Sequence, residues 1–529
     1  MKRLIITTII LLIAAVGVTV VYFKNLNPQA QRTSRIMHSI PSSASVVFEF
    51  NNDGGFYDIF NDNKLFTSLI GEQPIDDLDT LRKELLLNPL LEQFFTGQNI
   101  FISLHPLKNN SIGLLLTTSA LNGFKATVID QLAKQQNNGL LITPFYIDGK
   151  KGYTIYSDII KKRFYLVNKE DDIFSGSFSK DLVVQVMQAN PKKDETMFTL
   201  LPDQQNANSL ANLYVNYNQL NPLFEQLFAN KNTDIFKSFR LLPALSALSL
   251  NFKSNALMFS GLTDIQKNAP QAYLNLFINQ QSVVNELKDI FPSTTAYSIT
   301  FGISDPEKFK NDLSKWQVSA GLRREKDSLL KQVKTQTGIN LVTEFNQLLG
   351  SEFAIVTTKY QEKLAIIAIK DGSLLKPIIN NISTKLTDNS GQFNYNKLPF
   401  FLLGDAFHIF KRPYYMVIDN YLVMANSANE LASYYDSYIN HKFLSKLSEY
   451  NQFDHLIAER SNASWFINFK NSQPILKRDL DPGFDEAFEN NDPGWRNFYA
   501  ASFQLVATGK RFYTNFCMNL NLPDTTNVK

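Results

Sequence analysis

The chain has little cysteine and no clustered histidine. Cys517 is the single cysteine among 529 residues, which excludes an intramolecular disulfide and any zinc or iron–sulfur site built from several thiolates. It lies in the apolar run FYTNFCMNL, so we expect a buried core thiol. The histidines are scattered without the spacing of a metal site, and they are His38, His105, His408, His441 and His455.

Charge of either sign is also scarce. Charged residues make up 19% of the chain, with 52 Lys and Arg against 49 Asp and Glu, for a net charge of +3. Nucleic-acid binding normally needs a strongly basic face, so this balance predicts no nucleic-acid partner. The aromatic content of 12% and hydrophobic content of 44% suffice for packed domains and exclude a disordered acidic chain.

Recognisable catalytic motifs are missing. No Gly-x-Ser-x-Gly elbow, phosphate loop, His-Glu-x-x-His or Gly-x-Gly-x-x-Gly occurs in the sequence. Ser-x-x-Lys begins at Ser177, Ser328 and Ser373, but the companion Ser-Asp-Asn and Lys-Thr-Gly motifs of penicillin-binding enzymes are absent. We therefore predict no catalytic residue and no enzyme activity.

Two stretches partly match cation sites. Residues 49–60 begin like a calcium loop, but Phe60 stands where that loop needs a bidentate carboxylate. Residues 479–492 are rich in Asp and Glu, and we expect a solvated loop with a short helix there, with a Ca²⁺ site as the alternative. Neither stretch has a complete set of metal ligands, so the sequence predicts no metal-binding or cofactor-binding residues and no cofactor.

The first long apolar run predicts a membrane anchor. Residues 4–23 are uncharged, follow Lys2 and Arg3 and would span about 30 Å as a helix, the thickness of a bilayer's hydrocarbon core. A signal peptide cleaved after Ala15 or Gly17 is the alternative. We expect the cytoplasmic membrane to hold residues 4–23, with a cytoplasmic N-terminus and an extracytoplasmic bulk, periplasmic if the source has two membranes.

The second half of the chain repeats the first. Pro41 matches Pro292 at an offset of 251 residues, and Gly97 matches Gly350 at an offset of 253. Three further blocks keep the same order, and they begin at Lys161 and Lys411, Asn212 and Ser464, and Ala247 and Ala500. Chance matches would not hold so constant an offset over more than 200 positions, so we infer a tandem duplication.

Each repeat has the pattern of an α+β unit. Alternating apolar residues predict strands at 45–50 and 296–301, and hairpin-like strands are expected at 152–168 and 400–425. Helices lie between them, one of which begins with Asp305 as its N-cap and Pro306 as its first residue. The predicted fold class is α+β, a tandem duplication of a mainly antiparallel sheet-plus-helices unit, preceded by one transmembrane helix. Its parts are an anchor and juxtamembrane segment (residues 1–35), a first repeat (36–265), a junction (266–282) and a second repeat (283–525).

The apolar N-terminus, the strand openings IPSSAS and FPSTTA and the duplicated unit resemble uncharacterised bacterial envelope proteins. Such proteins have one N-terminal span and an exported domain of unknown function. The resemblance implies a location and an architecture, and it implies no catalytic residues.

Three classes of function stay open at this point. The first is a non-enzymatic, membrane-anchored interaction or scaffold protein of the bacterial envelope, which the lack of motifs favours. The second is a carrier that binds a lipid or other apolar ligand in a groove of its curved sheets. The third is an envelope enzyme with an unrecognised site. The expected partners are accordingly an envelope protein or an apolar ligand, and a large apolar cavity would favour the second class.

Overall fold

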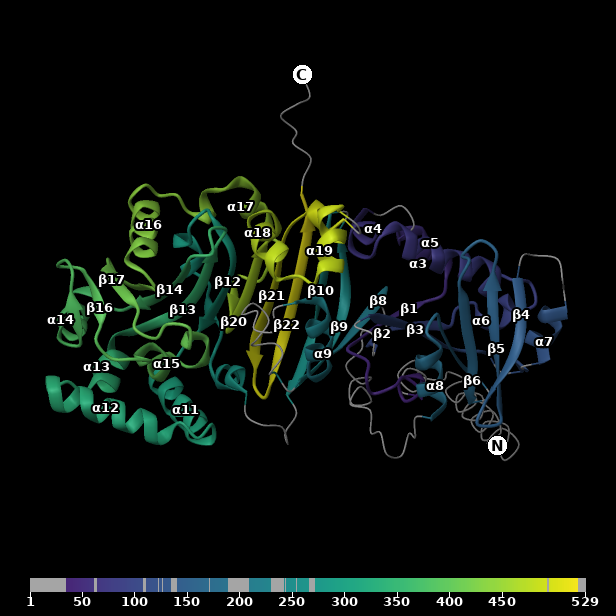
Figure 1. Cartoon of the computed structure of the whole chain (residues 1–529), viewed down its shortest axis with the longest axis horizontal. Helices are drawn as coiled ribbons and strands as arrows, with labels where there is room; N and C mark the ends of the chain where they lie inside the picture. Colours follow the sequence, from purple (N-terminus) through teal and green to yellow (C-terminus); the bar gives the residue numbers. More distant parts are fainter. Residues whose placement is uncertain are drawn as a thin grey trace, which may run out of the picture.

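The described part of the chain is built on one continuous sheet. Within it, twenty strands join side by side, and every pairing between them is antiparallel. The sheet runs along the long axis of the protein, from the first repeat to the second (Figure 1). This computed structural model describes residues 35–60, 64–107, 111–121, 123–125, 127–134, 140–170, 172–188, 209–229, 242, 244–253, 255–265, 272–491 and 494–521.

The first repeat supplies one half of the sheet. From the outer edge inward, its strands lie in the order β4, β5, β6, β7, β3, β2, β1, β8, β9, β10. Their bounds are β1 (Val46–Asn51), β2 (Asn99–Pro106), β3 (Ile112–Ser119), β4 (Leu140–Ile147), β5 (Lys150–Ser157), β6 (Arg163–Glu170), β7 (Ile173–Ser177), β8 (Ala211–Asn216), β9 (Ala244–Lys253) and β10 (Ala256–Ile265).

The second repeat continues the sheet with the same order in reverse. From the centre outward, its strands are β22, β21, β20, β12, β13, β14, β18, β17, β16, β15. Their bounds are β12 (Thr295–Gly302), β13 (Leu349–Thr358), β14 (Lys363–Ile369), β15 (Ser383–Lys385), β16 (Ser390–Phe393), β17 (Tyr414–Ile418), β18 (Tyr421–Ala425), β20 (Ala463–Asn468), β21 (Phe498–Thr508) and β22 (Arg511–Leu520). A separate pair joins β11 (Val283–Val284) to β19 (Arg460–Ser461).

The two halves meet where β10 pairs with β22. The closing hairpins match at an offset of 255 residues, because Lys253 pairs with Ala256 in one and Thr508 with Arg511 in the other. At that offset Ser260 is equivalent to Asn515, and these two residues face each other across the β10–β22 pair. A local twofold axis therefore passes between them and relates the strands of the two repeats.

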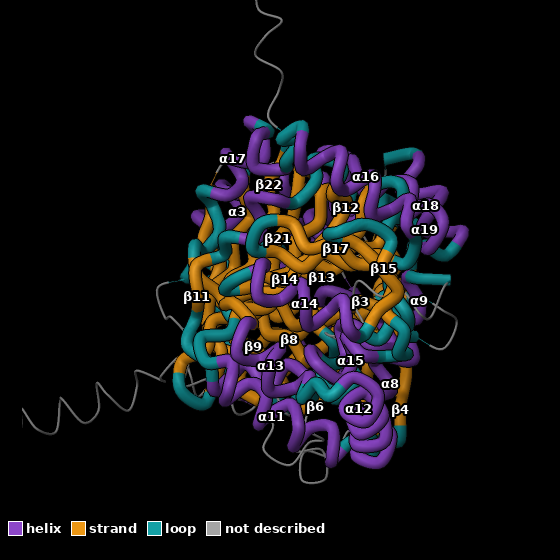
Figure 2. Tube along the Cα trace, turned by 90° about the vertical axis from the view of Figure 1, so that its left-hand side faces the viewer, coloured by secondary structure: helices purple, strands orange, loops and turns teal. Residues whose placement is uncertain are grey.

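Helices lie on both sides of the strand layer (Figure 2). In the first repeat they are α3 (Gly54–Phe60), α4 (Lys64–Ile70), α5 (Glu72–Leu81), the π-helix η1 (Arg82–Leu86), α6 (Glu92–Phe95), α7 (Thr127–Lys134), α8 (Lys180–Gln188) and α9 (Tyr217–Leu227). In the second they are η5 (Tyr273–Asn279), η6 (Leu287–Ile290), α11 (Pro306–Ser319), α12 (Arg323–Thr337), α13 (Leu341–Leu348), α14 (Gly372–Asn381), α15 (Leu398–Leu403), η7 (Asp405–Phe407), α16 (Ala428–Ile439), η8 (Leu444–Lys446), α17 (Ser448–Asp454), α18 (Phe469–Asp479), α19 (Pro482–Glu489) and η9 (Trp495–Asn497).

Local chemistry explains why equivalent elements begin at equivalent places. The Pro41 carbonyl accepts the Ala44 amide at 3.1 Å, and the Pro292 carbonyl accepts the Thr295 amide at 2.9 Å, so each proline turn leads into a strand. Asn216 and Asn468 each end a strand and cap the helix that follows. These two asparagines are a shared polar feature that sequence comparison of the repeats did not identify.

The predicted fold class was wrong in its transmembrane helix. Residues 4–23, which were expected to form it, lie outside the described residues. Among the helices of the described residues, none is both long and apolar enough to cross a bilayer. The 15-residue α12, for example, would span roughly 22 Å of the ~30 Å needed and carries several charges. The fold is corrected to a large, mostly antiparallel sheet with helices.

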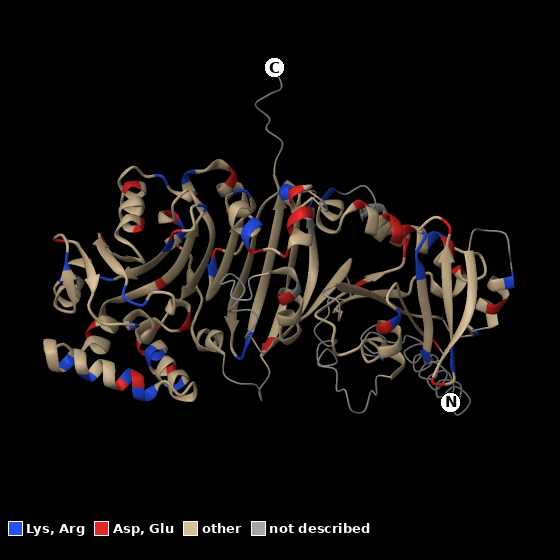
Figure 3. Ribbon diagram, in the orientation of Figure 1, with Lys and Arg blue, Asp and Glu red and all other residues tan. Residues whose placement is uncertain are grey.

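Smaller differences concern strand assignment. Residues 400–425 were expected to be hairpin-like strands, but α15 and η7 occupy the start of that range and only β17 and β18 are strands. The edge strand β4 and the short strand β7 were not predicted. Figure 3 shows Lys and Arg interspersed with Asp and Glu over the outer helices, with α12 carrying both signs.

Candidate functional site

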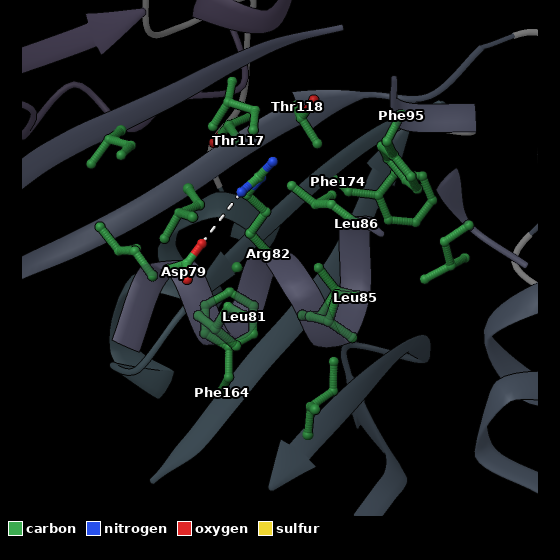
Figure 4. Close-up of a pocket in the computed structure, with 18 of the residues that line it drawn as sticks. Asp79, Leu81, Arg82, Leu85, Leu86, Phe95, Thr117, Thr118, Phe164 and Phe174 are labelled. Atoms are coloured by element: carbon green, nitrogen blue, oxygen red, sulfur yellow. Dashed lines mark hydrogen bonds and ion pairs between the residues drawn. The ribbon is translucent and has the colours of Figure 1, made fainter. Parts of the chain in front are cut away.

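A cavity of about 240 Å³ lies in the first repeat, between one face of the sheet and the helices that cover it. Figure 4 shows Leu81, Leu85 and Leu86 of the helical layer and Phe164 and Phe174 of the strands converging on this space. The lining residues are Phe48, Phe50, Phe56, Tyr57, Phe66, Ile70, Ile75, Leu78, Asp79, Leu81, Arg82, Leu85, Leu86, Leu91, Phe95, Ile100, Ile102, Leu116, Thr117, Thr118, Phe124, Ile129, Leu132, Ile142, Ile155, Phe164, Leu166, Phe174 and Gly176.

The strand wall of the cavity follows from the alternation of strand side chains. Phe48 and Phe50 are two residues apart on β1 and therefore share a face, which Ile102 and Ile100 of β2 continue as their paired neighbours. Glu49 lies between the two phenylalanines and points to the opposite face, where its carboxylate accepts hydrogen bonds from Asn99, Asn212 and Tyr214, the last at 2.6 Å.

The helical wall follows from residues spaced three or four apart on α5 and η1. Ile75, Leu78, Arg82 and Leu85 have this spacing and lie on one helix face. Ile75, Leu78 and Leu85 are only partly buried, and Ile70 at the end of α4 is 44% exposed. Partly exposed apolar side chains therefore form the helical wall of the cavity.

The interior of the cavity is aromatic and aliphatic. Phe50 stacks on Phe56 at 4.1 Å between ring centroids, and Phe124 meets the edge of Phe174 at 5.0 Å. An apolar cavity of about 150 Å³ in an engineered protein stays dry and binds benzene, so the present volume can hold a larger apolar group. Its lining and size fit a hydrocarbon chain or a ring system.

A small polar group lies in the cavity wall. The Arg82 guanidinium lies 3.5 Å from the centroid of the Tyr57 ring, and its Nη1 donates to Asp79 Oδ1 at 3.3 Å. Lys83 Nζ approaches the other oxygen of Asp79 at 2.6 Å. Burial raises the pKa of Tyr57 to about 12, so its hydroxyl stays neutral and donates to Asn52 Oδ1 at 2.9 Å.

The equivalent face of the second repeat is filled. Strand pairings relate the two faces position by position: the Phe50–Ile100 pair of β1 and β2 corresponds to the Phe301–Phe353 pair of β12 and β13. The further equivalent pairs, first repeat named first, are Phe48 and Ile299, Ile102 and Ile355, Leu116 and Ala365, Thr118 and Ile367, Phe174 and Leu422, Gly176 and Met424, and Leu166 and Tyr415. In the second repeat these side chains belong to the largest hydrophobic core.

Three phenylalanines from outside the sheet occupy that second face. The ring of Phe277 on η5 stacks on Phe301 at 4.9 Å, and those of Phe309 on α11 and Phe407 on η7 lie 5.6 Å from Phe353. All three are at most 1% exposed. The protein's own rings thus pack this sheet face closely in the second repeat, whereas in the first repeat the described residues, Phe56 and Phe124 among them, leave a cavity of about 240 Å³.

The Ser-x-x-Lys serines have structural contacts. Ser177 Oγ donates to the Leu114 carbonyl at 2.6 Å, and Ser373 Oγ donates to Asp371 Oδ1 at 2.6 Å in the cap of α14. Ser328 lies inside α12. Ser177 and Ser373 are therefore accounted for by local structural hydrogen bonds.

Carboxylates of the two partial cation sites likewise make local hydrogen bonds and ion pairs. Asp53 Oδ1 accepts the Phe56 amide at 2.9 Å, Asp481 caps α19, and Glu489 forms an ion pair with Lys477. Within the part of the chain that the structure describes, no group of three or more His, Cys, Asp or Glu side chains is arranged to hold a metal ion. Asp492 lies outside the described residues.

His105 lies between two serine side chains, a contact that the sequence did not predict. His105 is fully buried, with Nδ1 2.9 Å from Ser43 Oγ and Nε2 2.8 Å from Ser103 Oγ. Burial lowers the pKa of His105 to about 4, so the ring is neutral. A serine–histidine dyad uses a third group to orient the ring, and here Ser103 holds that position. The contacts satisfy a buried imidazole, and the cavity lies on the other face of the strand.

Comparison with known proteins yields little. No family model and no curated protein matches the chain. Two crystal structures of a protein named TP0453, crystal forms III and I, align at 11% identity with TM-scores of 0.23 and 0.21, and each alignment covers 47% of this chain and 88% of the other. A likeness at that level carries no argument, so the resemblance to envelope proteins stays a prediction.

Proposed function

We propose that this protein binds an apolar ligand in the cavity of the first repeat, with one ligand per chain and no catalytic role. The observation that carries the proposal is the contrast between equivalent faces: Phe277, Phe309 and Phe407 fill one, whereas the described residues over the other leave a partly open cavity of about 240 Å³. Since protein interiors normally pack to crystal-like density, an apolar space of this size favours a ligand that fills it.

The proposal moves the carrier function ahead of the scaffold function that the sequence favoured. An interaction surface requires no cavity, whereas a carrier requires a protected apolar site. Ten buried methylene groups contribute about 8 kcal/mol at ~0.8 kcal/mol each, comparable to the free energy of a micromolar dissociation constant before the costs of immobilising the ligand. A single hydrocarbon chain therefore suffices for measurable binding. The extracytoplasmic location and the envelope partner stay predictions.

Titration of the full chain with a neutral apolar probe tests the proposal. Diphenylhexatriene fluoresces when it leaves water, and dodecan-1-ol should displace it with a stoichiometry of one per chain. Ile102→Phe places a larger ring in the cavity wall and should weaken binding at least tenfold. Ile355→Phe makes the same change at the equivalent position of the filled repeat and should leave binding unchanged.

The opposite results are equally clear. Absence of saturable probe binding, or equal loss of binding in both variants, would contradict the first-repeat site. A second binding site that Ile355→Phe abolishes would contradict the inference that the equivalent face of the second repeat is filled.

A further inference from the structure

A cationic side chain enters the otherwise apolar cavity. Arg82 projects from η1 with its side chain 18% exposed, and in Figure 4 its guanidinium points toward Thr117 and Thr118 of β3. Its stacking on Tyr57 is favourable, since a guanidinium is attracted to the face of an aromatic ring. Removing a charge from water is costly, however, and normally requires a full set of hydrogen-bond partners.

Arg82 lacks such a set. A guanidinium has five N–H donors, and Arg82 donates to Asp79 at the long distance of 3.3 Å. Its Nε is buried and has no hydrogen-bond partner among the described residues. An unsatisfied donor of this kind has room for an acceptor supplied by a ligand.

The local charge also favours an anion. Asp79 is shared between Arg82 and Lys83, and the lysine is the nearer partner at 2.6 Å. Asp79 and Arg82 are the charged residues among those that line the cavity. Two cations therefore share the carboxylate of Asp79, while the second carboxylate near Tyr57, that of Asp53, accepts the Phe56 amide at 2.9 Å.

We propose that the ligand is a single-chain amphiphile whose hydrocarbon fills the cavity and whose oxyanion pairs with the Arg82 guanidinium. The planar fork of arginine matches a carboxylate or phosphate in bidentate geometry. This inference rests on the proposed function and adds the class of head group. Arg82 then selects among apolar ligands, and the aromatic walls supply most of the binding free energy.

Calorimetric titration of the full chain at pH 7.5 with dodecanoate, dodecan-1-ol and acetate tests the head group. Hydrogen bonds to charged groups are worth enough to predict binding of dodecanoate about tenfold to a hundredfold tighter than dodecan-1-ol. Acetate should not bind measurably, which separates an amphiphile's head group from a free anion. These three titrations need no variant, so they test the inference even if a substitution at Arg82 impairs folding.

Two variants localise the preference. Arg82→Met should bring dodecanoate to the affinity of dodecan-1-ol, and unchanged binding of the alcohol will show that the cavity is intact. Lys83→Met removes an equal charge from the adjacent, more exposed position outside the cavity lining and should keep the preference.

Each remaining result overturns a defined part of the reasoning. Equal affinity of the wild-type chain for acid and alcohol, or a preference that survives Arg82→Met, overturns the head-group inference alone. Failure of all the amphiphiles to bind overturns the proposed function and the inference that rests on it.

Discussion

The contrast between a hollow and a filled face predicts opposite effects of one substitution at two equivalent positions. Ile102 lines the cavity, whereas Ile355 occupies the same place in the sheet of the second repeat and is 8% exposed in a packed core. Phenylalanine has three more side-chain carbons than isoleucine. At ~0.8 kcal/mol per buried carbon, Ile102→Phe can raise the free energy of unfolding by up to about 2 kcal/mol.

Ile355→Phe should have the opposite sign. Its ring must displace neighbours such as Phe353 and Ala365, and overpacking of a filled core typically costs about 1–3 kcal/mol. Equilibrium urea unfolding of the ligand-free full chain, followed by tryptophan fluorescence and circular dichroism, measures both changes. The same sign for both variants, within about 0.5 kcal/mol of each other, would refute the claim that one face is hollow.

Three further predictions concern other buried groups. Phe277→Ala should cost about 3–5 kcal/mol of unfolding free energy and open a second site, so probe titration should then give two ligands per chain; a stoichiometry that stays at one contradicts this. Burial raises the pKa of Glu352 to about 7, so stability that is present below its ordinary pKa of 4.5 should fall as pH rises through 7, by up to about 3 kcal/mol. In Glu352→Gln, the free energy of unfolding, measured with urea between pH 5 and 8, should depend less on pH. An unchanged pH dependence would contradict the assignment to Glu352. Burial also raises the pKa of the Cys517 thiol to about 12, so a thiol reagent at pH 8 should label it only as fast as the chain unfolds. Rapid labelling of the folded chain would contradict the burial of this thiol.

Local patterns in the sequence were sufficient to locate many elements. The period-2 alternation at residues 45–50 and 296–301 corresponds to β1 and β12, because side chains alternate between the two faces of a strand, including in β12, where every residue is buried. Asp305 and Pro306 likewise mark the start of α11, where the Asp305 side chain accepts the Lys308 amide at 3.0 Å. Both signals arise within a few residues of chain.

The alignment of the closing strands shows the limit of such patterns. The sequence comparison paired Ala247 with Ala500, whereas the strand register makes Ala247 equivalent to Ser502. The error is two residues, which preserves the buried face and therefore leaves the apolar pattern unchanged. Pairing partners such as β10 and β22 are set by contacts between residues about 250 apart, which no local pattern encodes.

The cavity could not be predicted for a related reason. Phe48 and Phe50 look like ordinary core residues, as do Ile299 and Phe301. What differs is whether Phe277, Phe309 and Phe407 reach the face from segments outside the aligned blocks. Side-chain size within the aligned strands gives no consistent signal, since Gly176 and Thr118 are smaller than their equivalents Met424 and Ile367, whereas Leu116 and Phe174 are larger than Ala365 and Leu422. Arg82 carried no signal, because a single arginine on a predicted helix is normally exposed.

The pairing of β10 with β22 has a consequence for how such a chain can arise. Because Ser260 and Asn515 are equivalent and face each other, each repeat presents the same edge strand to its neighbour. A chain with one repeat would expose this edge, and two identical chains would join through it as an isologous dimer. The tandem chain is the covalently linked form of that dimer. Because the two repeats of one chain need not have the same sequence, one repeat can fill its interior with phenylalanine while the other keeps a cavity.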